Sequence, residues 1–264
     1  MGPLASLGIG LWFATLLGGP LTAASPVFAA ELAEIQARGY LIVAVKDNWR
    51  PLGFRNQAGE LVGLEIDIAR RLAEVIFDDP NALELVPVAN SERLTAVLTD
   101  EVDIAVAGVT LTPDRMRVVH FSVPYYLDGI GLISRDRRLT GLNDLDQLDQ
   151  GAIAVLNDSA AVSRLNFLLP QAPLIGVDSY QEAKALLDQG TARAFAGDLT
   201  VLAGWEQEYP EYRLLPSLLS SAPLVVTMPK GLQYRPLQDL VDDSLNQWHE
   251  SGWLEDRATY WGLP

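Results

Sequence analysis

Polar side chains follow several predicted strands at the points where those strands end. The set contains two cations, one anion, two hydroxyl groups, one aromatic ring and one glycine. Its members are Lys46, Trp49, Gly108, Thr110, Arg115, Ser159 and Asp198. In open α/β sheets, ligands bind just beyond the carboxyl ends of the strands. Because an unpaired buried charge is costly, a pocket with charges of both signs favours a small zwitterion over neutral isosteres.

The stretch from Thr110 to Arg115 has a specific physical interpretation. Thr112 is suited to cap a short helix with Pro113 at its first position, which would point backbone N–H groups at a bound anion. Arg115 adds a bidentate, charge-assisted contact to a carboxylate, and Asp198 would pair with an ammonium group. On spacing alone, ordinary surface or interlobe salt bridges of Arg115 and Asp198 remain an equal alternative.

Strand and helix signals alternate along the chain and must position these residues. Continuous apolar runs predict strands buried on both faces, and amphipathic stripes predict helices between them. In the first half we expect strands at Leu41–Val45, Leu83–Val88 and Val102–Ala107, with helices from about Gly63 and through Leu94–Leu98.

The second half repeats this alternation. Strands are predicted at Ala152–Leu156 and Ala192–Ala196, a Ser179/Glu182 capping box precedes a helix over Ala183–Leu187 that stops at Gly190, and a helix runs from Pro236 to Gly252. Such spacing predicts an α/β architecture with mainly parallel sheets. Two series separated by Tyr125–Asp149 predict two lobes.

Composition excludes several function classes. The 264 residues include 19 Lys and Arg against 34 Asp and Glu, a net charge of −15, and no run of cations longer than two. Nucleic acid is therefore not an expected partner. The absence of cysteine excludes disulfides, thiolate nucleophiles, Cys-ligated metals and a lipoprotein anchor. With only His120 and His249, we expect no histidine-rich metal site, no cofactor and no catalytic residue.

The first thirty residues carry no charged side chain, and Leu4–Leu21 is an apolar stretch broken by Gly and Pro. Small or short residues at Val27-Phe28-Ala29 fit a cleavage site, so residues 1–29 are interpreted as a secretory signal peptide. No Lys or Arg precedes the apolar run, and an uncleaved membrane anchor is the alternative. Export places the expected location in the periplasm.

Four segments resemble the family 3 bacterial extracellular solute-binding proteins, the amino-acid receptors of ABC importers. They are Gly63–Ala69, Val102–Arg115, Val119–Tyr126 and Ser251–Leu254, within a resemblance that runs from about residue 35 to the end. This resemblance implies a two-lobed periplasmic-binding-protein-like (type II) fold with a ligand cleft between the lobes. Lobe I would comprise residues 30–127 plus 224–264 and lobe II residues 128–223, with crossover strands near Tyr125–Gly131 and Ser220–Val226.

The resemblance also implies roles for the residues at the strand ends. Arg115 would hold the α-carboxylate of an amino acid with help from Thr110, and Asp198 would pair with its ammonium. Gly108 would offer its carbonyl to the ammonium, and the backbone N–H of Ser159 would reach the carboxylate. Two positions depart from the family pattern: Ala160 follows Ser159 in place of a second hydroxyl residue, and Gly108 replaces a common serine.

The expected preference for one kind of ligand side chain depends on Lys46. In the resembling family, receptors for cationic amino acids have an acid at this position, and some receptors for acidic amino acids have a base. A lysine here therefore favours an acidic or polar ligand. The alternative is that Lys46 faces solvent and pairs with Asp47. Trp49 matches an aromatic wall of the family pocket. Arg93 matches an arginine near the pocket, for which we expect a structural role.

Three functions remain in competition. The leading hypothesis is a monomeric binding protein that closes about its hinge over a small amino acid and delivers it to the permease of an ABC transporter. A dehydratase-like enzyme on the same scaffold would need a positioned general acid or base, and Lys46 is the one pocket residue beyond the clamp that qualifies. A ligand sensor would need a signalling partner.

Overall fold

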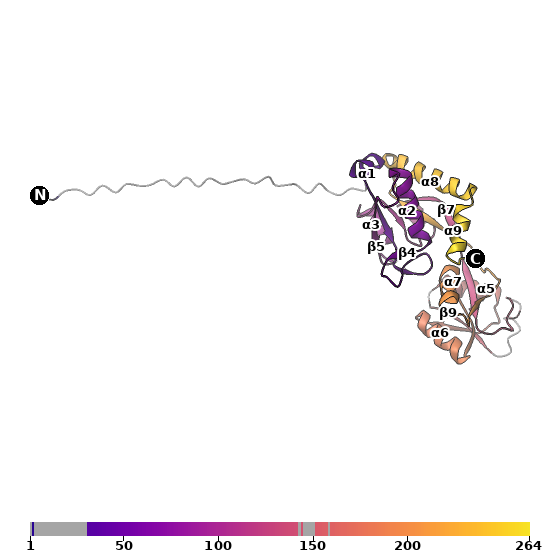
Figure 1. The fold of residues 1–264 in the computed structure, drawn as a ribbon. Helices are drawn as coiled ribbons and strands as arrows, with labels where there is room; N and C mark the ends of the chain where they lie inside the picture. The colour runs from indigo at the N-terminus through magenta and orange to yellow at the C-terminus, as the bar shows by residue number, and fades with distance from the viewer. Residues whose placement is uncertain (1, 3–30, 142–143, 145–150, 158) are drawn as a thin grey trace.

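The computed structural model describes residues 2, 31–141, 144, 151–157 and 159–264. Figure 1 shows two α/β lobes with the C-terminus at their junction. The expected signal peptide, residues 1–29, lies almost wholly outside the described residues. Within the part that is described, no helix is both long enough and apolar enough to cross a membrane.

The first lobe is built on a five-stranded sheet of order β5-β1-β6-β13-β7. Its strands are β5 (Leu83–Pro87), β1 (Leu41–Val45), β6 (Ile104–Val106), β13 (Ala222–Met228) and β7 (His120–Asp128). β1 pairs in parallel with both β5 and β6, whereas β13 is antiparallel to β6 and β7. The predicted parallel arrangement therefore holds for β5, β1 and β6, and β13 runs opposite to both of its neighbours.

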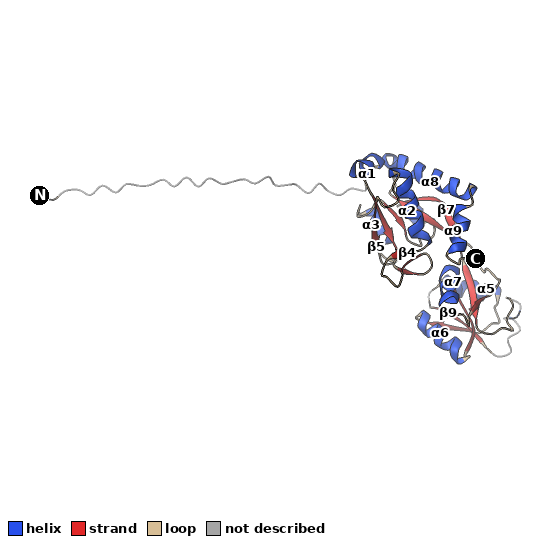
Figure 2. Cartoon of the chain, viewed as in Figure 1, coloured by secondary structure: helices blue, strands red, loops and turns tan. Residues whose placement is uncertain are grey.

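Helices cover both faces of this sheet, as Figure 2 shows. They are α1 (Leu32–Arg38), α2 (Leu64–Phe77), α3 (Arg93–Leu98), α8 (Arg235–Glu250) and α9 (Trp253–Tyr260), with 3-10 turns η1 (Arg115–Arg117) and η2 (Leu232–Tyr234). A small sheet of β2 (Asn48–Trp49), β3 (Gly53–Arg55) and β4 (Leu61–Val62) follows β1. The apolar stripes of α2 and α8 pack into one core with β1 and β6.

The second lobe has its own five-stranded sheet of order β10-β9-β11-β8-β12. These strands are β10 (Leu174–Val177), β9 (Ala152–Leu156), β11 (Ala192–Asp198), β8 (Ile130–Ser134) and β12 (Arg213–Leu214), and the helices are α5 (Ala160–Leu168), α6 (Tyr180–Gln189) and α7 (Leu199–Glu208). β10, β9 and β11 are parallel, and β8 is antiparallel to β11. Apolar clusters on the two faces form a core separate from that of the first lobe.

Most predicted elements are present, and their ends differ in informative ways. β1 and β9 have the predicted bounds, β6 is shorter than Val102–Ala107, and β11 extends to include Asp198. Gly252 ends one helix and begins another, because its left-handed φ of 76° turns the chain from α8 into α9. In the predicted capping box, the Ser179 hydroxyl accepts from Glu182 N at 3.1 Å, but the Glu182 carboxylate accepts from Asp178 N instead of Ser179 N.

The chain crosses between the two sheets at adjacent points. It leaves β7 at Asp128 and enters β8 at Ile130, and it returns into β13 at Ala222, the residue paired with Asp128. The buried Asp128 carboxylate accepts from Gly129 N at 2.8 Å, from Thr200 N at 3.1 Å and from the Thr200 hydroxyl at 2.8 Å. This side chain therefore ties the crossing point to the start of α7.

Candidate ligand-binding site

A pocket of about 650 Å³ lies between the two lobes. Three residues of the predicted site line it: Lys46 and Trp49 from the first lobe and Asp198 from the second. Sequence reasoning did not find the other polar and aromatic residues of its wall, which include Asn48, Arg50, Asn90, Tyr180, Gln181, Trp205 and Glu208. Arg115, Thr110, Gly108 and Ser159 do not line this pocket, so the predicted residues fall into two sets, three that line it and four that do not.

Lys46 follows directly after β1 and is only 4% exposed. Its ammonium donates to the Val88 carbonyl at 2.7 Å, while Asp47 pairs with Arg55 at 3.4 Å. The alternative of a solvent-facing Lys46 paired with Asp47 is therefore wrong. Burial, followed by the nearby Arg93, lowers the pKa of Lys46. Two of its three N–H donors have no recorded partner among the described residues, and they remain for a ligand.

Arg115 begins the 3-10 turn η1, and its Nη1 donates to the Thr110 carbonyl at 2.9 Å. The predicted cap is present, because the Thr112 hydroxyl accepts from Arg115 N at 3.4 Å, but the helix is a 3-10 turn that starts at Arg115 and not at Pro113. Met116 N and Arg117 N donate to the carbonyls of Thr112 and Asp114, so they do not point at a bound anion. The anion-binding capacity of this loop thus resides in the Arg115 guanidinium, which has further donors.

Gly108 forms the turn between β6 and Thr110, with a left-handed φ of +62°. A Cβ here would lie 2.7 Å from the Trp49 ring, so glycine permits both the turn and the close approach of that ring. The Gly108 carbonyl, which we expected to face a ligand ammonium, accepts from Arg93 Nη1 at 2.7 Å. The same nitrogen donates to the Ala107 carbonyl at 3.0 Å. These bonds support the structural role expected for Arg93.

Glu65, which sequence reasoning did not single out, lies behind Gly108 at the start of α2. It is fully buried, and its Oε1 accepts from Gly108 N at 2.6 Å and from the Tyr125 hydroxyl at 2.5 Å. Burial raises the pKa of Glu65 to about 7 against the opposing effect of these two hydrogen bonds. An acid among the apolar residues of Gly63–Ala69 was the available signal, but its contacts come from the turn after β6 and from β7.

Asp198 and Ser159 belong to the second lobe. Asp198 is the last residue of β11 and caps no helix nitrogen with its side chain. Its surroundings raise the pKa of its carboxyl through desolvation, and Arg93 opposes this effect. The backbone N–H of Ser159, expected to reach a carboxylate, donates to the Leu156 carbonyl at 3.2 Å. The Ser159 hydroxyl is buried and without a hydrogen-bond partner in the described part of the chain.

Arg93 links the two sets of predicted residues electrostatically. Desolvation is the main cause that lowers its pKa, Arg115 acts in the same direction, and Glu65 and Asp198 oppose it. Arg93 therefore lies within the field of both Arg115 of the first lobe and Asp198 of the second. Around this region the cations are Lys46, Arg93 and Arg115, and the acids are Glu65 and Asp198.

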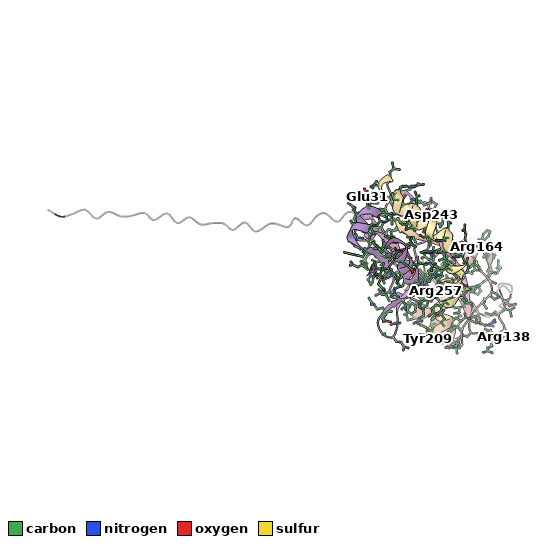
Figure 3. All side chains as sticks on the ribbon, turned by 45° about the horizontal axis from the view of Figure 1, so that its top comes forward. Glu31, Arg138, Arg164, Tyr209, Asp243 and Arg257 are labelled. Atoms are coloured by element: carbon green, nitrogen blue, oxygen red, sulfur yellow. The ribbon has the colours of Figure 1, made fainter. Side chains whose placement is uncertain are left out.

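Helix α7 packs against the first lobe at one side of the pocket. Ala203 is buried in the core of the first lobe, and Gly204 approaches so closely that a Cβ there would lie 2.4 Å from the Arg50 carbonyl oxygen. Arg50 pairs with Glu208 at 3.4 Å, and Gln207 donates to the Trp261 carbonyl at 2.8 Å. Figure 3 labels Tyr209, directly after α7, and Arg257, on α9 in the opposite lobe.

Comparisons with known proteins support one family. Residues 41–264 match the model of the bacterial extracellular solute-binding proteins, family 3. A glutamine-binding protein of Geobacillus stearothermophilus is 31% identical over 73% of this chain and 73% of its own length. A glutamate-binding protein of Corynebacterium efficiens is 30% identical over 67% of this chain and 61% of its own length.

An enzyme and a solved structure are also similar. A cyclohexadienyl dehydratase of Pseudomonas aeruginosa is 32% identical over 48% of this chain and 47% of its own length. The structure of an ancestral cationic amino acid solute-binding protein aligns with a TM-score of 0.73 and 26% identity, over 88% of this chain and 99% of that one. These matches confirm the two-lobed type II fold, and the chain belongs to the bacterial extracellular solute-binding proteins, family 3.

Proposed function

We propose that this protein captures a small acidic or polar amino acid by hinge closure and delivers it to the permease of an ABC importer. The observation that carries the proposal is the pocket of about 650 Å³, to which one lobe contributes the buried cation Lys46 and the other the acid Asp198. A ligand that touches both lobes stabilises the arrangement in which they meet. The lobes are residues 30–127 plus 224–264 and residues 128–223.

In this proposal, Arg115 binds the α-carboxylate beside the Thr110 carbonyl, and Asp198 binds the ammonium. The Gly108 carbonyl already accepts from Arg93, so it serves the ammonium only through its second lone pair. Ser159 contributes its unpartnered hydroxyl in place of the backbone N–H that donates to Leu156. Trp49 forms one wall of the pocket, and Lys46 faces the ligand side chain.

The charges of the site favour an anionic side chain. Lys46, Arg93 and Arg115 supply three cations, against which Asp198 and Glu65 supply two acids. An amino acid with a side-chain carboxylate leaves less uncompensated charge in a partly desolvated site than an amide does. Glutamine is the nearest alternative, because Asn48, Asn90 and Gln181 offer amide partners in the same wall.

The setting we propose is the periplasm, reached through the signal peptide of residues 1–29, with the protein acting as a monomer. We also propose that the protein is not an enzyme. The dehydratase of P. aeruginosa is the specific reason to test this, and Lys46, whose pKa burial lowers, is the general base that such chemistry would use. Turnover of a cyclohexadienyl compound would overturn the binding-only assignment.

The test is thermal unfolding of the chain from Glu31 onward against a panel of single amino acids. A ligand at about a hundred times its dissociation constant adds roughly 2.7 kcal/mol to the free energy of unfolding. A raised midpoint with glutamate or aspartate, absent in Arg115→Ala, supports the proposal. The exposed Arg117→Ala is the matched control, because its side chain is 80% exposed and lies in the same turn. No shift with any amino acid refutes the assignment.

A further inference from the structure

Glu65 is a buried acid with one carboxyl oxygen hydrogen-bonded and the other without a partner among the described residues. Its side chain is fully buried, its Oε1 is held by Gly108 N and the Tyr125 hydroxyl, and its Oε2 is buried without a hydrogen-bond partner in the described residues. No cation forms an ion pair with it within the described part of the chain. Beyond these two hydrogen bonds, the charged form of this carboxyl is supported by the field of more distant charges.

Two cations supply this field, and one of them, Lys46, lines the pocket of the proposed ligand. Lys46, at the end of β1, and Arg93, at the start of α3, both favour the charged form of Glu65. Neither bonds to it, because Lys46 donates to Val88 O and Arg93 donates to Ala107 O and Gly108 O.

Among the described groups that surround this site, Glu65 is the one whose protonation changes near neutral pH. Tyr125, on β7, contributes a hydroxyl that stays protonated, since burial raises its pKa well above the usual value. On the side of α2 that meets α9, Asp67 is already paired with Arg257 at 3.0 Å. Beyond its hydrogen bonds from Tyr125 and Gly108, the charge of Glu65 is therefore supported by the fields of Arg93 and Lys46.

We propose that Glu65 is a positioning residue and an internal counter-charge, which sets how strongly Lys46 and Arg93 attract an anionic ligand. It holds the Gly108 turn through one oxygen and competes, through its charge, with the side-chain carboxylate of the ligand. The inference rests on the proposed function and deepens it: it assigns the choice between an acidic amino acid and its amide to a residue that does not touch the ligand.

The competition links ligand binding to a proton. An anionic ligand near Lys46 and Arg93 weakens their support of the Glu65 carboxylate, so the pKa of Glu65, about 7 without ligand, rises in the complex. The complex then holds more protons than the free protein. Affinity for an acidic amino acid consequently falls as the pH rises above about 7, and affinity for a neutral amide changes less.

The experiment is isothermal titration of the chain from Glu31 onward with L-glutamate and L-glutamine at about pH 6 and about pH 8. Buffers of different ionisation enthalpy report the proton uptake directly. We expect glutamate to bind about fivefold or more tightly at the lower pH, with proton uptake near pH 7. In Glu65→Gln, which keeps an acceptor for Gly108 N, glutamate affinity at about pH 8 should rise and the pH dependence should disappear. Glu74→Gln, an exposed position on the same helix, is the matched control.

Tyr125→Phe provides a second test that retains the carboxyl group. Loss of the hydroxyl donor to Oε1 removes support of the charged form, so the fall in glutamate affinity should move to higher pH. A pH dependence that persists in Glu65→Gln would assign it to Lys46 and overturn the inference. Equal losses for both ligands at both pH values would show that Glu65 only maintains the fold. Failure of the wild type to bind any amino acid would instead refute the proposed function.

Discussion

The packing of α7 against Arg50 yields a sharp prediction for Gly204→Ala. A Cβ at position 204 would lie 2.4 Å from the Arg50 carbonyl oxygen and 3.0 Å from its carbon. Real Cβ contacts stay beyond 3.0 Å, so the two backbones must separate by at least about 0.6 Å. The obstacle is backbone on both sides, and no rotation of a side chain relieves it. The substitution therefore acts on the contact between the two lobes.

The expected magnitude follows from two opposing effects. Overpacking of a close contact costs about 1 to 3 kcal/mol, whereas alanine in a helix interior is favoured over glycine by about 1 kcal/mol. The second effect stabilises α7 in all states of the protein, but the first applies only where α7 meets Arg50. We expect the unfolding midpoint of the empty protein to change little and the ligand affinity to fall roughly 5- to 150-fold.

Isothermal titration with the best ligand of the amino-acid panel measures the affinity, and small-angle scattering measures the separation of the lobes. Gly141→Ala is the control, since among the described residues a Cβ there would meet only the Ser217 hydroxyl at 3.6 Å. Unchanged affinity and unchanged scattering in Gly204→Ala would refute the reasoning. That result would mean that α7 and the Arg50 backbone can move apart without a measurable loss of free energy.

Three further predictions concern single charges. Arg115→Ala should weaken binding of any amino acid by about 2 kcal/mol or more in a titration, because the ligand carboxylate loses its cation, while Arg117→Ala should bind like the wild type. Lys46→Met should weaken glutamate binding about tenfold and glutamine binding less, as measured by titration of both ligands. Burial raises the pKa of Asp128 to about 6, so its contribution to stability is present below pH 3.8 and is lost as the pH rises through about 6. In urea unfolding, Asp128→Asn, which keeps an acceptor for Thr200 N, should remove this pH dependence, on the order of 3 kcal/mol.

The sequence predicts the centre of each lobe well because central strands are buried on both faces. Leu41–Val45 and Ala152–Leu156 are continuous apolar runs, and the structure gives both strands those bounds. Strand ends are set by pairing with neighbours that lie far away in the sequence. β11 continues to Asp198 because that residue pairs with Ile130 of β8. No pattern within Ala192–Asp198 contains this information.

The site was predictable where it depends on strand ends and not where it depends on contacts between lobes. Lys46 and Asp198 follow from the ends of β1 and β11, and both line the pocket. Trp205 and Tyr180 reach the same pocket from two helices of the second lobe, where they pack with Phe195. Their aromatic character suits the core of one lobe as well as the wall of a cleft, so the sequence cannot separate the two roles.

Two tryptophan side chains line the pocket, so the intrinsic fluorescence of the protein can report ligand binding. Trp49 belongs to the first lobe and Trp205 to the second, and the Trp49 Nε1 is buried with no hydrogen-bond partner in the described residues. Indole emission depends on the polarity around the ring, and entry of a ligand between these residues replaces the water in contact with them. Occupancy can therefore be followed through the emission of the unlabelled protein, and replacing Trp49 or Trp205 by phenylalanine, one at a time, would assign the signal to one lobe.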